Sequence, residues 1–290
     1  MLVLYSTEDF QYEITDFGTV IIVGYNGNEK IIKIPEIISG CIVTSLGDFA
    51  FNECTATNII LPNTLTKIGC STFFKCKSLE SIEIPETVTS IGDAAFFECA
   101  KLKSIRIPKN VRIISRWLCG LCHSLEEAIL PEEVDKMDTE VFLRCKSLFY
   151  VKLPKNIKNI PNSTFQGCSS LVNIHIPENV ERIGESAFSE CISLKKIVLP
   201  ESTKFISDAA FEKCELLSQI YIPKNIKSIG DIAFDGCKSL KTIIYKGTKE
   251  ELKRAFFGFY EAMLISDIEI KNKKDSDIDI FLNALLNDKY

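Results

Sequence analysis

Apolar residues recur along the chain with a period of about 23 residues, which lies in the range of solenoid repeats. In the unit that begins at Cys76, Ile82 and Ile84 alternate with polar residues, and Pro85 follows them. Because β-branched residues favour strands and proline withdraws a backbone donor, this pattern predicts a short strand over residues 80–84. Each unit is therefore expected to contribute one short strand.

The return path of the same unit is apolar at irregular spacings. Its recurring apolar residues are Val88, Ile91, Ala95 and Phe96. Their spacings of three, four and one do not sustain a long helix, so we expect wide turns or one short helical turn before the next unit.

Cysteines and prolines keep the same period. Nine of the twelve cysteines follow it, with a single spacing shortened by one position: Cys54, Cys76, Cys99, Cys122, Cys145, Cys168, Cys191, Cys214 and Cys237. A unit of this length is too short for a propeller blade, and it fits one strand with a return path. The apolar columns are then expected to stack from coil to coil into one continuous core, with strands about 4.8 Å apart.

The repeated string Cys-x-Ser-Leu-x-x-Ile-x-Ile-Pro-x-x-Val-x-x-Ile-Gly-x-x-Ala-Phe-x-x-Cys closely resembles the BspA-like leucine-rich repeats, in which isoleucine often replaces leucine. The resemblance implies an α/β-type repeat solenoid, a leucine-rich-repeat rod or horseshoe with one short parallel strand per 23-residue coil, capped at both ends. It also implies a role in protein interaction or surface adhesion, and the family brings no catalytic signature.

The resemblance divides the chain into three parts. Residues 1–34 resemble the family's N-terminal cap hairpin, residues 35–245 form the solenoid of about nine coils, and residues 246–290 form a C-terminal cap. Thr248 and Glu251 have the spacing of a capping box, which predicts a helix over about residues 249–258. Residues 268–270 alternate as a last strand would.

A second helix is expected near the C-terminus, after a polar linker. Its apolar residues fall at i, i+3, i+4, i+7 and i+8, and they are Ile278, Phe281, Leu282, Leu285 and Leu286. This spacing gives one apolar face. We expect the helix to fold back over the open end of the solenoid, and self-association through it is the alternative.

Composition narrows the function classes. The chain has a formal net charge of −5, which disfavours nucleic acid as a partner because phosphate binding needs clustered basic residues. No apolar run is long enough for a transmembrane segment, and no signal peptide is evident. These features favour a cytoplasmic location, while the family resemblance keeps the cell surface as the alternative.

The nine periodic cysteines are expected to be buried and unbridged, because equivalent positions in stacked coils point the same way and a disulfide needs converging vectors. Cys41 is expected to be the exposed cysteine. Cys119 and Cys122 form a lone Cys-x-x-Cys pair, which does not make a zinc site. No cofactor or metal is predicted.

The same sequence offers no catalytic site. Cys122 and His123 are adjacent, but neighbours on an extended turn diverge and Cys122 belongs to the core column. No nucleophile motif or phosphate loop occurs, so the protein is not expected to be an enzyme.

The repeat has a glycine column that contains Gly92, and the equivalent position in another coil is Pro161. Because proline fixes φ near −65°, this column does not require a positive φ.

Outward strand positions carry the functional hypothesis. They are charged in the first coils and become apolar or aromatic midway along the chain. The predicted partner-binding residues are Phe149, Tyr150, Val172, His175, Val198 and Tyr221, with Lys152, Lys195 and Lys241 at the rim. Aromatic anchors of this kind dominate many interfaces, so Tyr150, His175 and Tyr221 are expected to be exposed at the centre of a protein-binding site.

The resulting hypothesis is a non-catalytic protein-interaction module that binds through its strand-lined face. A cell-surface adhesin that recognises host or neighbouring-cell proteins is the first alternative. An enzyme with a cryptic site is the alternative from another class.

Overall fold

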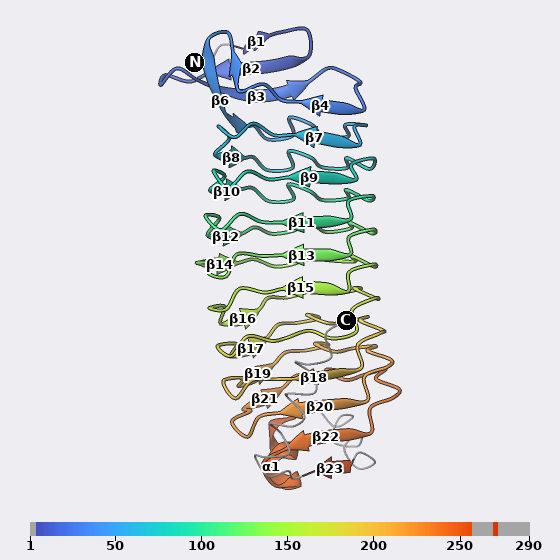
Figure 1. Cartoon of the computed structure of the whole chain (residues 1–290). Coiled ribbons are helices and arrows are strands. Elements are labelled where there is room, and N and C mark those ends of the chain that lie inside the picture. Colours follow the sequence, from blue (N-terminus) through green and yellow to red (C-terminus); the bar gives the residue numbers. More distant parts are fainter. Residues whose placement is uncertain (1–3, 257–268, 272–290) are drawn as a thin grey trace. The chain divides into compact units, whose positions relative to one another are not determined.

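The computed structural model describes residues 4–256 and 269–271. The chain divides into two compact units, Met1–Pro154 and Lys155–Tyr290. Both are built from stacked coils with parallel strands, and each coil corresponds to one repeat of the sequence (Figure 1).

The first unit begins with an antiparallel meander, in the region where the sequence predicts a cap hairpin. Its strands are β1 (Leu4–Ser6), β2 (Phe10–Ile14) and β3 (Thr19–Tyr25). β3 then pairs in parallel with β6 (Cys41–Leu46), which also pairs with the two-residue β5 (Ile37–Ile38). The switch to parallel pairing therefore occurs between β3 and β6.

The predicted strands of the first unit form two parallel ladders. They are β4 (Ile31–Lys33), β7 (Asn58–Ile60) and β9 (Ser81–Glu83), then β11 (Ser104–Arg106), β13 (Glu127–Ile129) and β15 (Tyr150–Lys152). Residues one repeat apart pair directly, as in Ile59 with Ile82. The inward residue of each pair is buried or nearly so, and the repeat thus places equivalent apolar side chains on top of one another.

Each coil also contains a second strand, which the sequence pattern did not reveal. In the first unit these are β8 (Lys67–Ile68), β10 (Ser90–Ile91), β12 (Ile113–Ile114) and β14 (Lys136–Met137). They lie on the return path that was expected to be turns, and they pair in parallel with the equivalent residues of a neighbouring coil.

The second unit has the same plan. Its return-path strands are β16 (Asn159–Ile160), β17 (Arg182–Ile183), β19 (Phe205–Ile206) and β21 (Ser228–Ile229), and its other sheet holds β18 (Lys196–Val198), β20 (Gln219–Ile222), β22 (Thr242–Tyr245) and β23 (Glu269–Lys271). β23 agrees with the expected last strand. The strand expected near Ile174 is absent, and Ile174 is only half-buried. Asn173, a residue depleted in strands, lies in that segment.

The predicted capping box is present. Helix α1 (Lys249–Ala255) begins after Thr248, whose hydroxyl accepts from the Glu251 amide, while the Glu251 carboxylate accepts from the Thr248 amide at 2.7 Å. Both bonds satisfy donors that a helix start leaves unpaired. The second, C-terminal helix expected around Leu282 lies outside the described residues.

The turns between the second strand and the periodic cysteine use left-handed backbone at two non-glycine positions in most coils. In the coil that ends at Cys99 these are Ala94 (φ 55°) and Glu98 (φ 58°). Such a conformation costs about 1–2 kcal/mol for a residue with a Cβ. It aims alternate amides at the next coil, where Ala94 and Glu98 donate to the carbonyl oxygens of Arg116 and Gly120 at 2.9 and 2.8 Å.

Phenylalanine and cysteine columns form the centre of each unit. Phe73 and Phe96 stack with ring centroids 5.3 Å apart, and Phe188 and Phe211 do so at 5.4 Å in the second unit. Beside the phenylalanines, the periodic cysteines from Cys76 to Cys214 are buried, and all twelve thiols are free. Cys54 and Cys237, the first and last of the nine, are half-buried, which follows from their having a neighbouring periodic coil on one side only.

The expectation that Cys41 is the exposed cysteine was wrong. Cys41 is half-buried because it is paired at the start of β6, and Cys70 is the exposed cysteine. The glycine column behaves as predicted, since Gly92 is not among the glycines with a positive φ. A Cβ on Gly92 would instead lie 2.5 Å from the Cys70 backbone nitrogen, so this glycine is required by the close approach of the preceding coil.

Candidate partner-binding face

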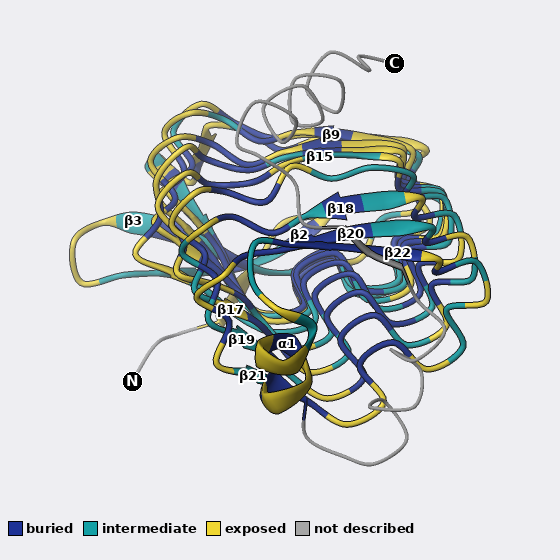
Figure 2. Ribbon diagram, turned by 90° about the horizontal axis from the view of Figure 1, so that it is seen from below, coloured by how far each residue is buried: buried dark blue, intermediate teal, exposed yellow. Residues whose placement is uncertain are grey.

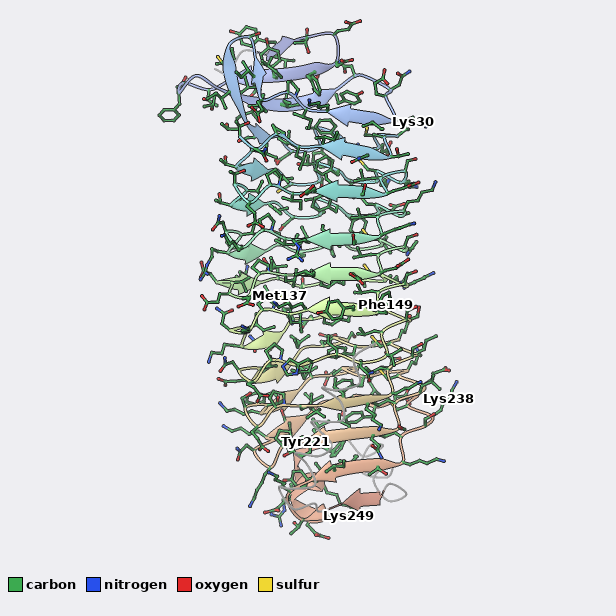
Figure 3. The ribbon with its side chains drawn as sticks, in the orientation of Figure 1. Lys30, Met137, Phe149, Tyr221, Lys238 and Lys249 are labelled. Carbon is green, nitrogen blue, oxygen red and sulfur yellow. The ribbon has the colours of Figure 1, made fainter. Side chains whose placement is uncertain are left out.

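Phe149 and Tyr150 mark the outward side of β15 in the first unit. Phe149 is 43% exposed (Figure 3). Tyr150 is half-buried. Tyr150 stands beside Glu127 in the parallel register, and Lys152 stands beside Ile129. The exposed Phe149 therefore lies directly before a strand pair that carries the charged Glu127 and Lys152 and the half-buried Ile129.

The rim residue Lys152 is part of an ion pair. Its Nζ lies 3.1 Å from Oε1 of Glu132, and both side chains are about half exposed. Exposed pairs of this kind contribute little to stability, so Lys152 and Glu132 remain accessible polar groups beside the apolar edge.

In the second unit, the predicted site residues differ in accessibility. His175 is exposed, while Val172 and Val198 are half-buried. The rim residue Lys241 is exposed, as expected, and so is Lys195. Because the segment around His175 forms no strand, its side chain is presented from irregular backbone instead of from a ladder.

Tyr221 does not match its prediction of exposure. Its ring is only 2% exposed and packs in a small cluster with Ile244 and Val198. Its hydroxyl donates a hydrogen bond to Oε1 of Glu201, a partner that the sequence pattern did not indicate. This hydrogen bond gives the hydroxyl a partner while the apolar ring is buried, a combination that is common for tyrosine.

The chemistry of the cysteines is that of a core. The thiol of Cys122 donates to the carbonyl oxygen of Phe96 at 3.0 Å, while Nδ1 of His123 lies 3.1 Å from the carbonyl oxygen of Arg144. The two side chains thus engage different groups and do not form a nucleophile–base pair. Burial raises the pKa of the Cys99, Cys145 and Cys191 thiols well above its usual range, which disfavours the reactive thiolate at these three positions. At Cys122, burial also acts to raise the pKa, but hydrogen bonds with Cys119 and Cys99 outweigh it and lower the pKa of this thiol.

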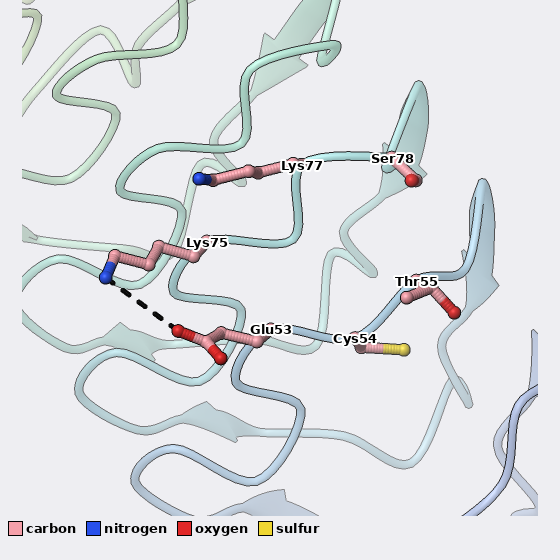
Figure 4. A pocket seen from close by; sticks show the side chains of 6 residues that line it. All are labelled: Glu53, Cys54, Thr55, Lys75, Lys77 and Ser78. Atoms are coloured by element: carbon pink, nitrogen blue, oxygen red, sulfur yellow. Dashed lines mark ion pairs between the residues drawn. The ribbon is translucent and has the colours of Figure 1, made fainter.

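A shallow depression lies at one edge of the first unit. It is lined by Glu53, Cys54, Thr55, Lys75, Lys77 and Ser78 (Figure 4). Lys75 and Glu53 approach to 3.8 Å across it. Within residues 4–256 and 269–271, no three His, Cys, Asp or Glu side chains are grouped to hold a metal ion. The depression offers an ion pair and hydroxyls without an activated nucleophile.

The repeat matches a known family. The model of the BspA type leucine-rich repeat region, in six copies, matches residues 44–172 and 159–281. The chain belongs to the BspA-type leucine-rich repeat family. Comparison with curated proteins gives no significant match.

Solved structures of leucine-rich repeat proteins share the fold of this BspA-type chain. The leucine-rich repeat protein of T. pallidum is 29% identical with a TM-score of 0.61, over 66% of this chain and 90% of that chain. A leucine-rich repeat protein of Eubacterium ventriosum is 22% identical with a TM-score of 0.55, over 86% of this chain and 73% of that chain. Members of the family are commonly protein-interaction or surface proteins.

The BspA-type coil also presents an aromatic row that the strand-based prediction missed. Phe74 stacks on Phe97 with ring centroids 5.5 Å apart, and Phe97 meets Trp117 edge-on at 6.2 Å. Arg116 lies over the Trp117 ring at 4.5 Å. Phe74 and Phe97 are one repeat apart, so the repeat period could have predicted this row from the sequence.

In the described ranges no helix is both long and apolar enough to cross a membrane.

Proposed function

We propose that this protein is a non-catalytic interaction module that binds a protein partner through the outward side of its predicted strands. The observation that carries the proposal is Phe149, a large aromatic side chain that is 43% exposed at the entry to β15. Exposing such a ring leaves apolar surface in water, and aromatic residues supply much of the energy of protein interfaces.

The surroundings of Phe149 support a protein as the ligand. Tyr150 adds a half-buried ring, and the exposed Lys152–Glu132 pair adds charge of both signs beside it. An apolar centre with a polar rim is the usual anatomy of a protein interface. In the second unit, exposed His175 with half-buried Val172 and Val198 is a separate candidate contact region.

Site-directed photo-crosslinking tests the proposal. A photoreactive phenylalanine analogue at position 149 or 175 should link the protein to a specific partner in an extract of its source organism, and mass spectrometry should identify that partner. Ile113, which is 51% exposed on β12, is the matched control position because it lies on the other strand set of the first unit.

Binding of the identified partner should then depend on the same residue. Phe149→Ala should weaken binding about thirtyfold or more, because truncating a central aromatic anchor costs about 2 kcal/mol or more. Ile113→Ala should leave the affinity unchanged. Equal crosslinking from positions 149 and 113, or full affinity in Phe149→Ala, would contradict the proposal.

A further inference from the structure

The alternation of buried and exposed residues is lost in the last strands of the second unit. β9 and β11 each have one buried residue between two exposed ones. In β22 all four residues are buried, and in β20 the last three are (Figure 2). Strands buried on both faces read as nearly continuous apolar runs, as the Thr-Ile-Ile-Tyr sequence of β22 does. The outward side of these strands is therefore covered as well as the inward side.

The covered side is centred on Tyr221 and Ile244. Each is 2% exposed, and Val198 of the neighbouring strand packs against them, in a cluster separate from the main core. Helix α1 does not provide the cover, because it contacts β21 and the following residue, Phe256, pairs with Ile229 in the same strand. No other helix or strand among the described residues of the second unit lies across this side (Figure 2).

We propose that residues 278–286 of this chain dock as an amphipathic helix on the outward side of β18, β20 and β22. The segment has five apolar residues on one helical face, and they match the apolar surface that Val198, Tyr221 and Ile244 present. This inference is independent of the proposed function. It also differs from the cap that the sequence suggested, because the segment covers a sheet face and not the end of the coil stack.

The linker before residues 278–286 and the length of this segment are both compatible with the proposed position. β23 ends at Lys271, which pairs directly with Ile244, so the chain leaves the sheet beside the cluster. Six residues, 272–277, precede the segment and reach up to about 20 Å when extended. Nine helical residues are about 13 Å long, while β18 and β22 lie about 10 Å apart at two strand spacings. One helix can therefore lie over all three strands.

The charges are complementary too. Asp275, Asp277 and Asp279 stand at the amino end of the segment. Lys195 and Lys241 are exposed just before β18 and β22 begin. A helix that crosses the three strands has its amino end over either β18 or β22, and at the start of either strand these carboxylates lie near an exposed lysine, Lys195 or Lys241.

Crosslinking in the full-length protein tests this placement. A photoreactive phenylalanine analogue in place of Leu285 should link within one chain to peptides that contain residues 195–200, 218–222 or 241–246. Crosslinks to α1 or Phe234 would overturn the proposal in favour of an end cap, and crosslinks between two chains would overturn it in favour of self-association. The analogue at Asn283, on the opposite side of the helix, should give far fewer links to these strands.

A second measurement follows the solvent accessibility of Tyr221 on the outward side of these strands. The variant with Leu282→Asp and Leu285→Asp should raise the hydroxyl-radical oxidation of Tyr221 at least fivefold, as measured by mass spectrometry. The matched variant with Asn283→Asp and Asn287→Asp adds the same charge on the other side of the helix and should leave it unchanged. Equal protection of Tyr221 in both variants would overturn the proposal.

Discussion

The thiol of Cys99 donates a hydrogen bond to the carbonyl oxygen of Phe73 at 3.1 Å, across the boundary between two successive coils. The same carbonyl accepts the amide of Cys76 in its own coil, also at 3.1 Å. The pattern recurs in both units, as in Cys191 to Phe165 and Cys214 to Phe188. The periodic cysteine is therefore a polar link between coils as well as a small apolar filler.

Removing one link should weaken the fold by a modest amount. Cys99→Ala removes the sulfur and its hydrogen bond, while the Phe73 carbonyl keeps the Cys76 amide as a partner. We expect the free energy of unfolding, measured by urea denaturation, to fall by about 1–2 kcal/mol. Cys70→Ala, at the exposed cysteine, should change it by less than about 0.5 kcal/mol. Equal effects of the two substitutions would show that the thiol bond contributes nothing.

Thiol labelling should separate the cysteines by burial. Cys70 is exposed and should react first with a thiol reagent, followed more slowly by the half-buried Cys41, Cys54 and Cys237. The remaining cysteines are buried and should react only when the protein unfolds in denaturant. Mass spectrometry of the labelled peptides checks the order, and rapid labelling of nine or more thiols in the native protein would contradict the structure.

Stability should fall in alkaline solution. Burial raises the folded-state pKa of the Cys99, Cys145 and Cys191 thiols well above its usual range, so these thiols keep their protons when the unfolded chain has lost them. The free energy of unfolding is then unaffected by these thiols below the unfolded thiol pKa, which is about 8.5. It falls above that pH by up to about 1.4 kcal/mol per pH unit for each thiol.

The matched comparison uses single substitutions. Cys145→Ala should reduce the slope of stability against pH between about pH 9 and 10 by up to about 1.4 kcal/mol per unit, and Cys70→Ala should leave it unchanged. Denaturation curves measured at several pH values give the slopes. An identical slope in all three proteins would exclude the buried thiols as its source.

Close packing of the coils should make Gly92 intolerant of a side chain. A Cβ there would lie 2.5 Å from the Cys70 nitrogen and 2.6 Å from the Gly69 carbonyl carbon, both backbone atoms. Gly92→Ala should lower the free energy of unfolding by about 1–3 kcal/mol through overpacking. Gly47→Ala is the control in the same column, where the nearest atom would be 3.2 Å away, and it should cost less. A larger loss in Gly47→Ala would contradict this account.

The sequence by itself determined the repeat, the inward columns and the start of α1. The inward pairs such as Ile59 and Ile82 follow from the repeat period combined with alternation along a strand, and both features are local. The capping box at Thr248 could also be predicted from the sequence, because its two hydrogen bonds join residues three apart. Such features depend on residues that are close in the sequence or one repeat apart, so the sequence alone identifies the partners.

Only the tertiary structure decided the second strands and the accessibility of the outward residues. Two-residue strands such as β10 are too short to carry a period, and they exist because the neighbouring coil offers backbone partners. Tyr221 is compatible with exposure or burial, since a phenol combines an apolar ring with a polar end. Its ring packs against Ile244 and Val198, and its hydroxyl bonds to Glu201. These partners come from other strands and coils, so the alternation within one strand does not predict them.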